Sequence, residues 1–132
     1  MAVVIDTSAV IAVIVNESEK GALIRKTSGA DLLAPTSLHW EIGNAFSAML
    51  KRKRATSTQI QQALEVYQRI PIRLIDVDLA EALGLADQLG IYAYDAYVLT
   101  CALNQNGTLL SLDGGLIHAA KQVGIAVMEV DE

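Results

Sequence analysis

Short aliphatic runs alternate along the chain with longer segments in which apolar residues recur every three or four positions. The short runs predict buried β-strands at residues 2–5, 31–34, 72–75, 108–112 and 125–130. The longer segments predict α-helices at residues 9–15, 18–27, 37–54, 57–70, 79–89, 94–106 and 114–122. Because strands alternate with helices, we expect a parallel sheet with helices on both faces. The 132 residues are expected to form a single α/β domain over 1–132.

Two helices stand between the second and third predicted strands, where simple alternation would place one. We expect this pair to rise above the edge of the sheet as a lid or an arm. Its first helix has an apolar stripe of Leu38, Ile42, Ala45 and Met49 and ends in the run KRKR at 51–54. These four cations either lie in solvent, where they suit the helix dipole, or contact phosphates.

The composition narrows the class of protein. Hydrophobic residues make up 52% of the chain and aromatic residues only 5%, so the core is expected to be aliphatic. No apolar run approaches the roughly 20 residues that cross a bilayer, and the start lacks the basic region of a signal peptide. A single cysteine, Cys101, excludes an intramolecular disulfide and a cysteine-based metal cluster. We therefore expect a cytoplasmic protein that does not associate with membranes.

Four acidic residues occupy similar places at the ends of predicted elements. Asp6 ends the first strand, Asp113 ends the fourth, Asp95 opens a buried helix and Glu41 lies near the start of the longest helix. Ligands of open α/β sheets bind beyond the carboxyl ends of the strands, so these side chains are expected to face one crevice. For Asp6 alone, capping the next helix is an equally good interpretation.

Four converging carboxylates need a positive charge to offset their mutual repulsion. A site made only of carboxylate oxygens selects Mg²⁺ or Mn²⁺. Such an ion typically activates a water molecule and neutralises a scissile phosphate. The net charge of −5, from 15 acids and 10 bases, argues against a general nucleic-acid-binding surface. With the four acids set aside, however, the remaining 11 acids nearly balance the 10 bases.

The segments around these acids resemble the PIN domain and, more narrowly, the VapC-type ribonuclease toxins of type II toxin–antitoxin pairs. The resemblance rests on VIDTS at 4–8, EIGNA at 41–45, YDAY at 94–97 and LSLD at 110–113. The order of these segments, their spacing and the chain length all fit the family. The likeness covers nearly the whole chain.

The resemblance implies a three-layer α/β/α fold with a parallel sheet of about five strands in the order 3-2-1-4-5. It implies a Mg²⁺- or Mn²⁺-dependent endoribonuclease, in which metal-holding acids also orient the attacking water and two serines support them by hydrogen bonds. The implied metal ligands are Asp6, Glu41, Asp95 and Asp113, and the supporting residues are Ser8 and Ser111. It further implies a homodimer and a VapB-like antitoxin partner, with RNA as the substrate.

The sequence departs from the family pattern at one position, and it is also compatible with two other functions. Gly115 stands where many family members carry a further acid or Asn, which leaves open whether one or two metals bind. A non-catalytic PIN-like module would only bind RNA or a partner. A phosphatase with Asp6 as nucleophile would want a second Asp where Ser8 stands. Tyr92, Tyr94 and Tyr97 flank Asp95, and they either pack in the core or at the rim of the site or stack on an unpaired base.

Overall fold

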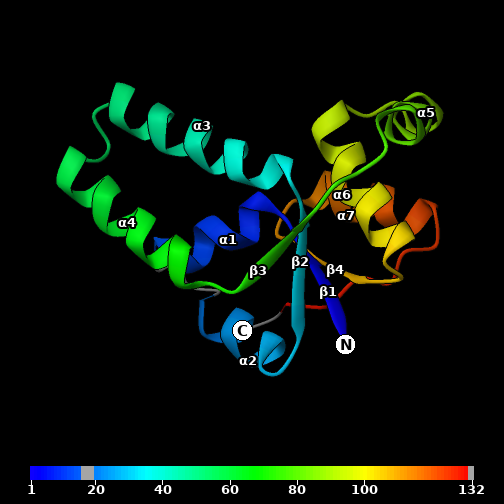
Figure 1. Ribbon diagram of the computed structural model, residues 1–132, viewed down its shortest axis with the longest axis horizontal. Coiled ribbons are helices and arrows are strands. Elements are labelled where there is room, and N and C mark those ends of the chain that lie inside the picture. Colours follow the sequence, from blue (N-terminus) through cyan, green and yellow to red (C-terminus); the bar gives the residue numbers. More distant parts are fainter. Residues whose placement is uncertain (16–19, 131–132) are drawn as a thin grey trace.

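The computed structural model describes residues 1–15 and 20–130, and Figure 1 shows the arrangement of the elements. The strands are β1 (Ala2–Ile5), β2 (Asp31–Pro35), β3 (Ile72–Ile75) and β4 (Thr108–Leu110). The helices are α1 (Thr7–Ile14), α2 (Lys20–Thr27), α3 (Ser37–Lys51), α4 (Ser57–Arg69), α5 (Leu79–Leu89), α6 (Ala93–Asn104) and α7 (Gly114–Gln122). The first two residues of the helix predicted at 18–27 lie outside the described residues. The predicted alternation of strands and helices is confirmed.

The four strands form one parallel sheet in the order β3-β2-β1-β4. At the centre, Val3 is paired with Leu32 on β2 and with Thr108 on β4. This order places the carboxyl ends of β1 and β4 side by side. The residues that follow them, Asp6 and Asp113, are therefore brought to the same edge of the sheet.

The predicted fifth strand, at 125–130, is reduced to a single parallel bridge between Leu109 and Val127. Backbone hydrogen bonds from Leu109 N to Ala126 O and from Met128 N to Leu109 O, both 2.8 Å long, hold it beside β4. Strand β4 itself ends at Leu110, two residues earlier than predicted. Beyond Leu110 the chain leaves the ladder to bond with side chains near Asp6.

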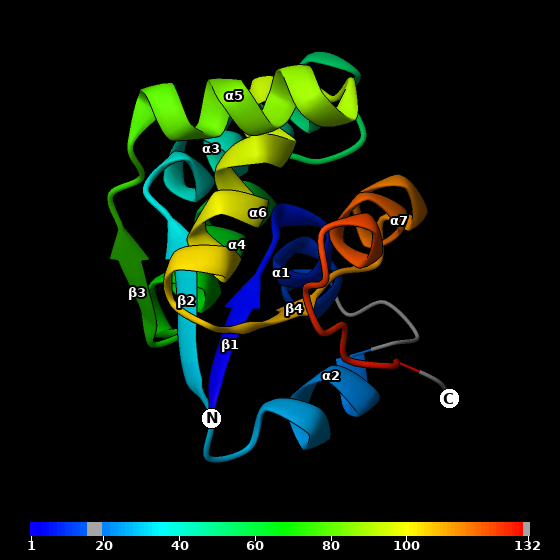
Figure 2. The same ribbon diagram turned by 90° about the vertical axis from the view of Figure 1, so that its right-hand side faces the viewer.

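Hydrophobic side chains cover both faces of the sheet, which gives the predicted three layers. Along β1, Val3 and Ile5 face one cluster and Val4 faces the other, as the alternation of a strand requires. The first cluster includes buried residues of α1, α2, α3 and α4, and the second includes those of α6 and α7. Figure 2 shows α5 lying beyond α6, against which it packs. No helix in the described ranges is both long and apolar enough to cross a membrane.

Helices α3 and α4 run side by side and extend away from the sheet as an arm (Figure 1). Helix α3 ends at Lys51, three residues before the predicted end at Arg54, and Phe46 takes the place predicted for Ala45 in its buried stripe. Helix α4 begins with a capping box, in which Thr56 and Gln59 exchange side-chain and backbone hydrogen bonds. The arm therefore has a sharply defined turn between its two helices.

Candidate functional site

Asp6 is the most buried of the four predicted acids, with 6% of its surface exposed. Its Oδ1 atom accepts a hydrogen bond from Ala9 N at 3.1 Å, so Asp6 caps α1 as one interpretation of the sequence predicted. Two serine hydroxyls also donate to the carboxylate. Ser8 Oγ lies 2.8 Å from Oδ1 and 3.0 Å from Oδ2, and Ser111 Oγ lies 2.7 Å from Oδ2. Capping α1 therefore uses only part of the carboxylate.

The two serines also join distant parts of the chain at the carboxyl edge of the sheet. Ser8 Oγ accepts a hydrogen bond from Leu112 N, and Ser111 Oγ accepts one from Asp113 N, both at 2.9 Å. Each hydroxyl thus accepts from the backbone that follows β4 and donates to Asp6. Because both groups are satisfied in this geometry, the Asp6 carboxylate is held in one orientation.

Asp113 is exposed and caps α7. Its Oδ1 atom accepts hydrogen bonds from Gly115 N at 2.9 Å and from Leu116 N at 3.3 Å. A Cβ atom at Gly115 would lie 3.4 Å from that same Oδ1 atom. A side chain at this position would therefore begin in van der Waals contact with the capping oxygen of Asp113.

Glu41 lies in the second turn of α3, and its Oε2 atom is buried with no hydrogen-bond partner among the described residues. Burial raises the pKa of Glu41, and the negative charges of Asp6 and Asp95 raise it further. The hydroxyls of Thr7 and Ser37 face this carboxylate and oppose the rise in pKa. Neither hydroxyl completes a hydrogen bond of standard geometry, and both are buried without a partner in the described chain. Sequence reasoning overlooked both residues, although Ser37 precedes Glu41 by one helical turn.

Charge coupling links all four acids into one neighbourhood. Burial raises the pKa of Asp6, against the opposing hydrogen bonds, and the charge of Asp113 adds a smaller rise. Asp95, in the first turn of α6, also has a raised pKa, chiefly from burial and then from Asp113. Since the charges of Asp6 and Asp95 also raise the pKa of Glu41, each of the four carboxylates repels its neighbours, and together they form a ring of like charges. The tertiary structure thus brings together four acids that the sequence grouped only because each lies near the end of a predicted strand or helix.

A family model for the PIN domain matches residues 3–122, which is most of the chain. The chain belongs to the PIN domain family. The similar solved structures include VapBC2 from Rickettsia felis bound to a DNA fragment from their promoter, with a TM-score of 0.68, 12% identity, and 99% of this chain and 100% of that chain covered. A comparison with curated proteins finds no significant match.

Two further structures share this PIN fold. VapC20 of Mycobacterium tuberculosis, described as a toxin that cleaves the sarcin–ricin loop, has a TM-score of 0.66 and 12% identity, with 96% of this chain and 98% of that chain covered. FitAcB from Neisseria gonorrhoeae has a TM-score of 0.67 and 17% identity, with 96% of each chain covered. At these identities the likeness establishes the fold.

The chemistry of this PIN domain's acidic edge suits a hard divalent cation. All of its charged donors are carboxylate oxygens, and the orphaned Oε2 atom of Glu41 has a lone pair available for a ligand. In the described parts of the chain, no three His, Cys, Asp or Glu side chains stand close enough to hold one ion between them. Mg²⁺ commonly binds through one or two carboxylates and completes its shell with water and substrate phosphate. The donors at this edge are therefore of the type that Mg²⁺ takes, although they do not form a three-residue cluster among the described residues.

Aromatic side chains flank the acidic edge of the PIN domain. Tyr94 packs edge-on against Tyr97, with ring centroids 5.8 Å apart, and is 50% exposed. Tyr92 is 87% exposed and Trp40 is 68% exposed. Trp40 also lines a cavity of about 210 Å³ with Tyr97 and Leu79. Sequence reasoning did not single out Trp40, although it immediately precedes Glu41.

Proposed function

We propose that this PIN domain is a metal-dependent endoribonuclease that hydrolyses RNA phosphodiester bonds with an activated water, and that it is the toxin of a type II toxin–antitoxin pair. The observation that carries the proposal is the environment of Asp6. A buried carboxylate is held in one orientation by Ser8, Ser111 and Ala9, within reach of the charges of other acids. Such preorganised charge is typical of a site that binds a cation.

Each residue has a stated part in this proposal. Asp6, Glu41, Asp95 and Asp113 would hold the ion, which supplies Lewis acidity and a water of lowered pKa when bound. The serines fix the Asp6 carboxylate, as outer-shell groups do in metal sites. The same four acids would orient the attacking water beside the ion, and the unpartnered Oε2 atom of Glu41 is the oxygen with no other hydrogen bond to lose when it does so.

The proposal is tested with Asp6→Asn. Asn keeps the shape of the side chain but removes the charge that fixes the ion, so cleavage of a structured RNA in Mn²⁺ should be abolished. Without metal the variant should melt at or above the wild-type temperature, because one of four repelling charges is gone. Mn²⁺ should stabilise the wild type and have a much smaller effect on the variant.

The matched control is Asp87→Asn, which removes an exposed acid of α5 outside the ring. It should cleave RNA and respond to Mn²⁺ like the wild type. If Asp6→Asn cleaves within about tenfold of the wild-type rate, a difference of about 1.4 kcal/mol in the barrier, then Asp6 acts only as a cap and the four-carboxylate site is wrong.

A binding-only PIN module is the second candidate, favoured by the lack of a closed three-ligand cluster among the described residues. It predicts that Mn²⁺ does not stabilise the wild type. An Asp6-nucleophile phosphatase is disfavoured, because both oxygens of Asp6 already accept hydrogen bonds from Ser8 and Ser111. A phosphatase would also turn over p-nitrophenyl phosphate, which a nuclease of this kind should leave intact.

We also propose that the partner is a VapB-like antitoxin and that the chain forms a homodimer. The VapBC2 and FitAcB structures support the first proposal through their shared fold. Exposed Leu79 and Leu83 on α5 support the second, and Leu79 lines a cavity together with the exposed Trp40 of α3. The product of a neighbouring gene should co-purify and inhibit, and light scattering should give a dimer. A monomer at micromolar concentration contradicts the dimer.

A further inference from the structure

Positive charge is concentrated at the tip of the arm. Residues 51–54 carry four of the ten Lys and Arg side chains, and all four are exposed. No acidic residue occurs between Glu41 and Glu65. The arm is therefore locally cationic in a chain whose net charge is −5. Such a separation of charge creates a field that attracts anions to the tip.

At this tip a lysine adopts a backbone conformation that is usually taken by glycine. Lys53 has a φ of 58°, in the left-handed region. Lys53 N donates to Leu50 O at 3.1 Å, and Arg54 N donates to Met49 O at 2.9 Å. This pair of bonds is the Schellman motif, in which the left-handed position is normally glycine. A lysine there raises the conformational free energy of the fold.

The other helix ends of the chain show what this position usually accepts. In the described residues, positive φ angles also occur at Gly29, Gly90, Gly124 and Asn106. Asn106 closes α6 with the same two bonds, from Asn106 N to Leu103 O and from Gly107 N to Ala102 O. Asn tolerates the left-handed region, whereas Lys gains nothing from it locally. A strained residue that the fold retains points to a role in function.

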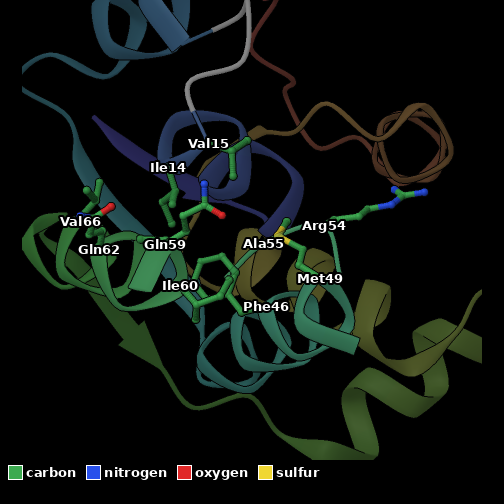
Figure 3. Close-up of a pocket in the computed structure, with 11 residues that line it drawn as sticks. Ile14, Val15, Phe46, Met49, Arg54, Ala55, Gln59, Ile60, Gln62 and Val66 are labelled. Atoms are coloured by element: carbon green, nitrogen blue, oxygen red, sulfur yellow. The ribbon is translucent and has the colours of Figure 1, made fainter. Parts of the chain in front are cut away.

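The side chains at the tip are directed outward. Figure 3 shows Arg54 pointing away from the apolar residues between α1, α3 and α4, such as Phe46 and Ile60. Lys53 and Arg54 also line a separate open cavity of about 330 Å³ at the turn. Lys51, the last residue of α3, follows Glu41 by ten positions, which corresponds to about 15 Å along the helix axis. The tip and the acidic edge therefore lie at opposite ends of one rigid element.

We propose that Lys51, Arg52, Lys53 and Arg54 form a docking site for the RNA phosphate backbone, at the end of α3 that lies about 15 Å from Glu41 along the helix axis. This inference rests on the proposed nuclease function and deepens it. The substrate class becomes an RNA long or folded enough to reach both ends of the arm, and a short oligonucleotide could not. Phosphate contacts of this kind position a nucleic acid without reading its sequence.

The test uses Lys53→Gly, which removes one cation and relieves the left-handed strain, so the variant should melt at or above the wild-type temperature. Binding is followed by fluorescence anisotropy in EDTA, with labelled oligouridine of about 20 nucleotides and with a labelled trinucleotide. One lost phosphate contact should weaken binding of the long RNA about threefold at 0.2 M salt and about eightfold at 0.05 M salt. The slope of log K against log salt should become shallower by about 0.7. Binding of the trinucleotide should not change.

Two matched controls separate charge from backbone. Asn106→Gly relieves the same backbone conformation without removing a charge, and Lys26→Gln removes an exposed charge of α2 without touching the arm. Both should bind the long RNA like the wild type. The proposal is overturned if Lys53→Gly binds like the wild type, or if either control weakens binding as much.

Failure of this inference and failure of the nuclease proposal give different results. If the wild type cleaves RNA and Lys53→Gly binds and cleaves the long RNA unchanged, only the docking site is wrong. If no RNA is cleaved but binding still depends on Lys53, only the nuclease proposal is wrong. Tighter, Lys53-dependent binding of labelled oligoglutamate than of RNA would overturn the docking site in favour of an acidic protein partner.

Discussion

Replacing Ser111 by alanine should weaken the fold by an amount that depends on pH. Ser111 is 2% exposed and joins two parts of the acidic edge. Its hydroxyl donates to Asp6 Oδ2 at 2.7 Å and accepts from Asp113 N at 2.9 Å. Alanine removes both bonds and leaves a buried carboxylate oxygen without this donor. Ser8 Oγ still lies within hydrogen-bond distance of both carboxylate oxygens and Ala9 N still donates to Oδ1, so Asp6 keeps part of its hydrogen bonding.

The magnitude follows from the character of the main bond. A buried hydrogen bond to a charged group contributes about 1.5–3 kcal/mol to stability. With the lost acceptor for Asp113 N, we expect Ser111→Ala to lower the free energy of unfolding by about 2–3 kcal/mol at pH 7. An unfolding entropy of about 2.1 cal/mol/K per residue makes each kcal/mol worth about 4 °C for a chain of this length. The melting temperature should therefore fall by about 8–12 °C.

The sign of the pH dependence follows from the pKa of Asp6. Burial raises this pKa in the folded protein above the reference value of 3.8, so ionised Asp6 lowers stability as pH rises through the folded pKa. Ser111 opposes that rise in pKa. The variant should therefore lose more stability than the wild type between acidic and neutral pH. Below the reference value, where Asp6 is protonated in both proteins, the difference should be smaller.

Thermal and urea denaturation at pH 7 and at about pH 3 measure this difference. Ser47→Ala, on the exposed face of α3, is the matched control and should change stability by less than about 0.5 kcal/mol at either pH. An equal loss for Ser111→Ala at the two pH values would refute a bond to an ionised acceptor. A loss no larger than that of the control would mean that the hydroxyl network adds nothing to stability.

Two further measurements test other buried groups. Because the pKa of Glu41 is raised in the folded protein, Glu41→Gln should be more stable than the wild type at pH 7 without metal. This gain in stability should disappear as pH falls below the reference value of 4.5. Urea denaturation that shows a less stable variant at pH 7 contradicts the prediction. Burial raises the pKa of the Cys101 thiol to about 11, so iodoacetamide at about pH 8 should alkylate it only after unfolding, as mass spectrometry of native and urea-treated protein can show. Rapid labelling of the native protein would mean that α6 opens readily.

Local signals predicted most elements of the fold correctly. The run at 2–5 forms β1, and Asp78 and Gly90 bound α5 as cap and stop residues do. These features depend on residues a few positions apart, which share one stretch of backbone. The end of α3 was predicted too late, because Lys51–Arg54 suit a helix end but do not show where the turn occurs. There the backbone bonds to Met49 and Leu50 close the helix.

Sequence by itself also placed each of the four acids at an element end near the carboxyl edge of the sheet. What it did not contain was how they are held. The bond between Ser111 and Asp6 spans 105 positions, and Leu112 N reaches Ser8 across 104. Such contacts exist only because β1 and β4 are neighbours, a pairing that no local pattern specifies. The burial of Asp6 and the position of Thr7 beside Glu41 arise in the same way, since each depends on how separate elements pack in space.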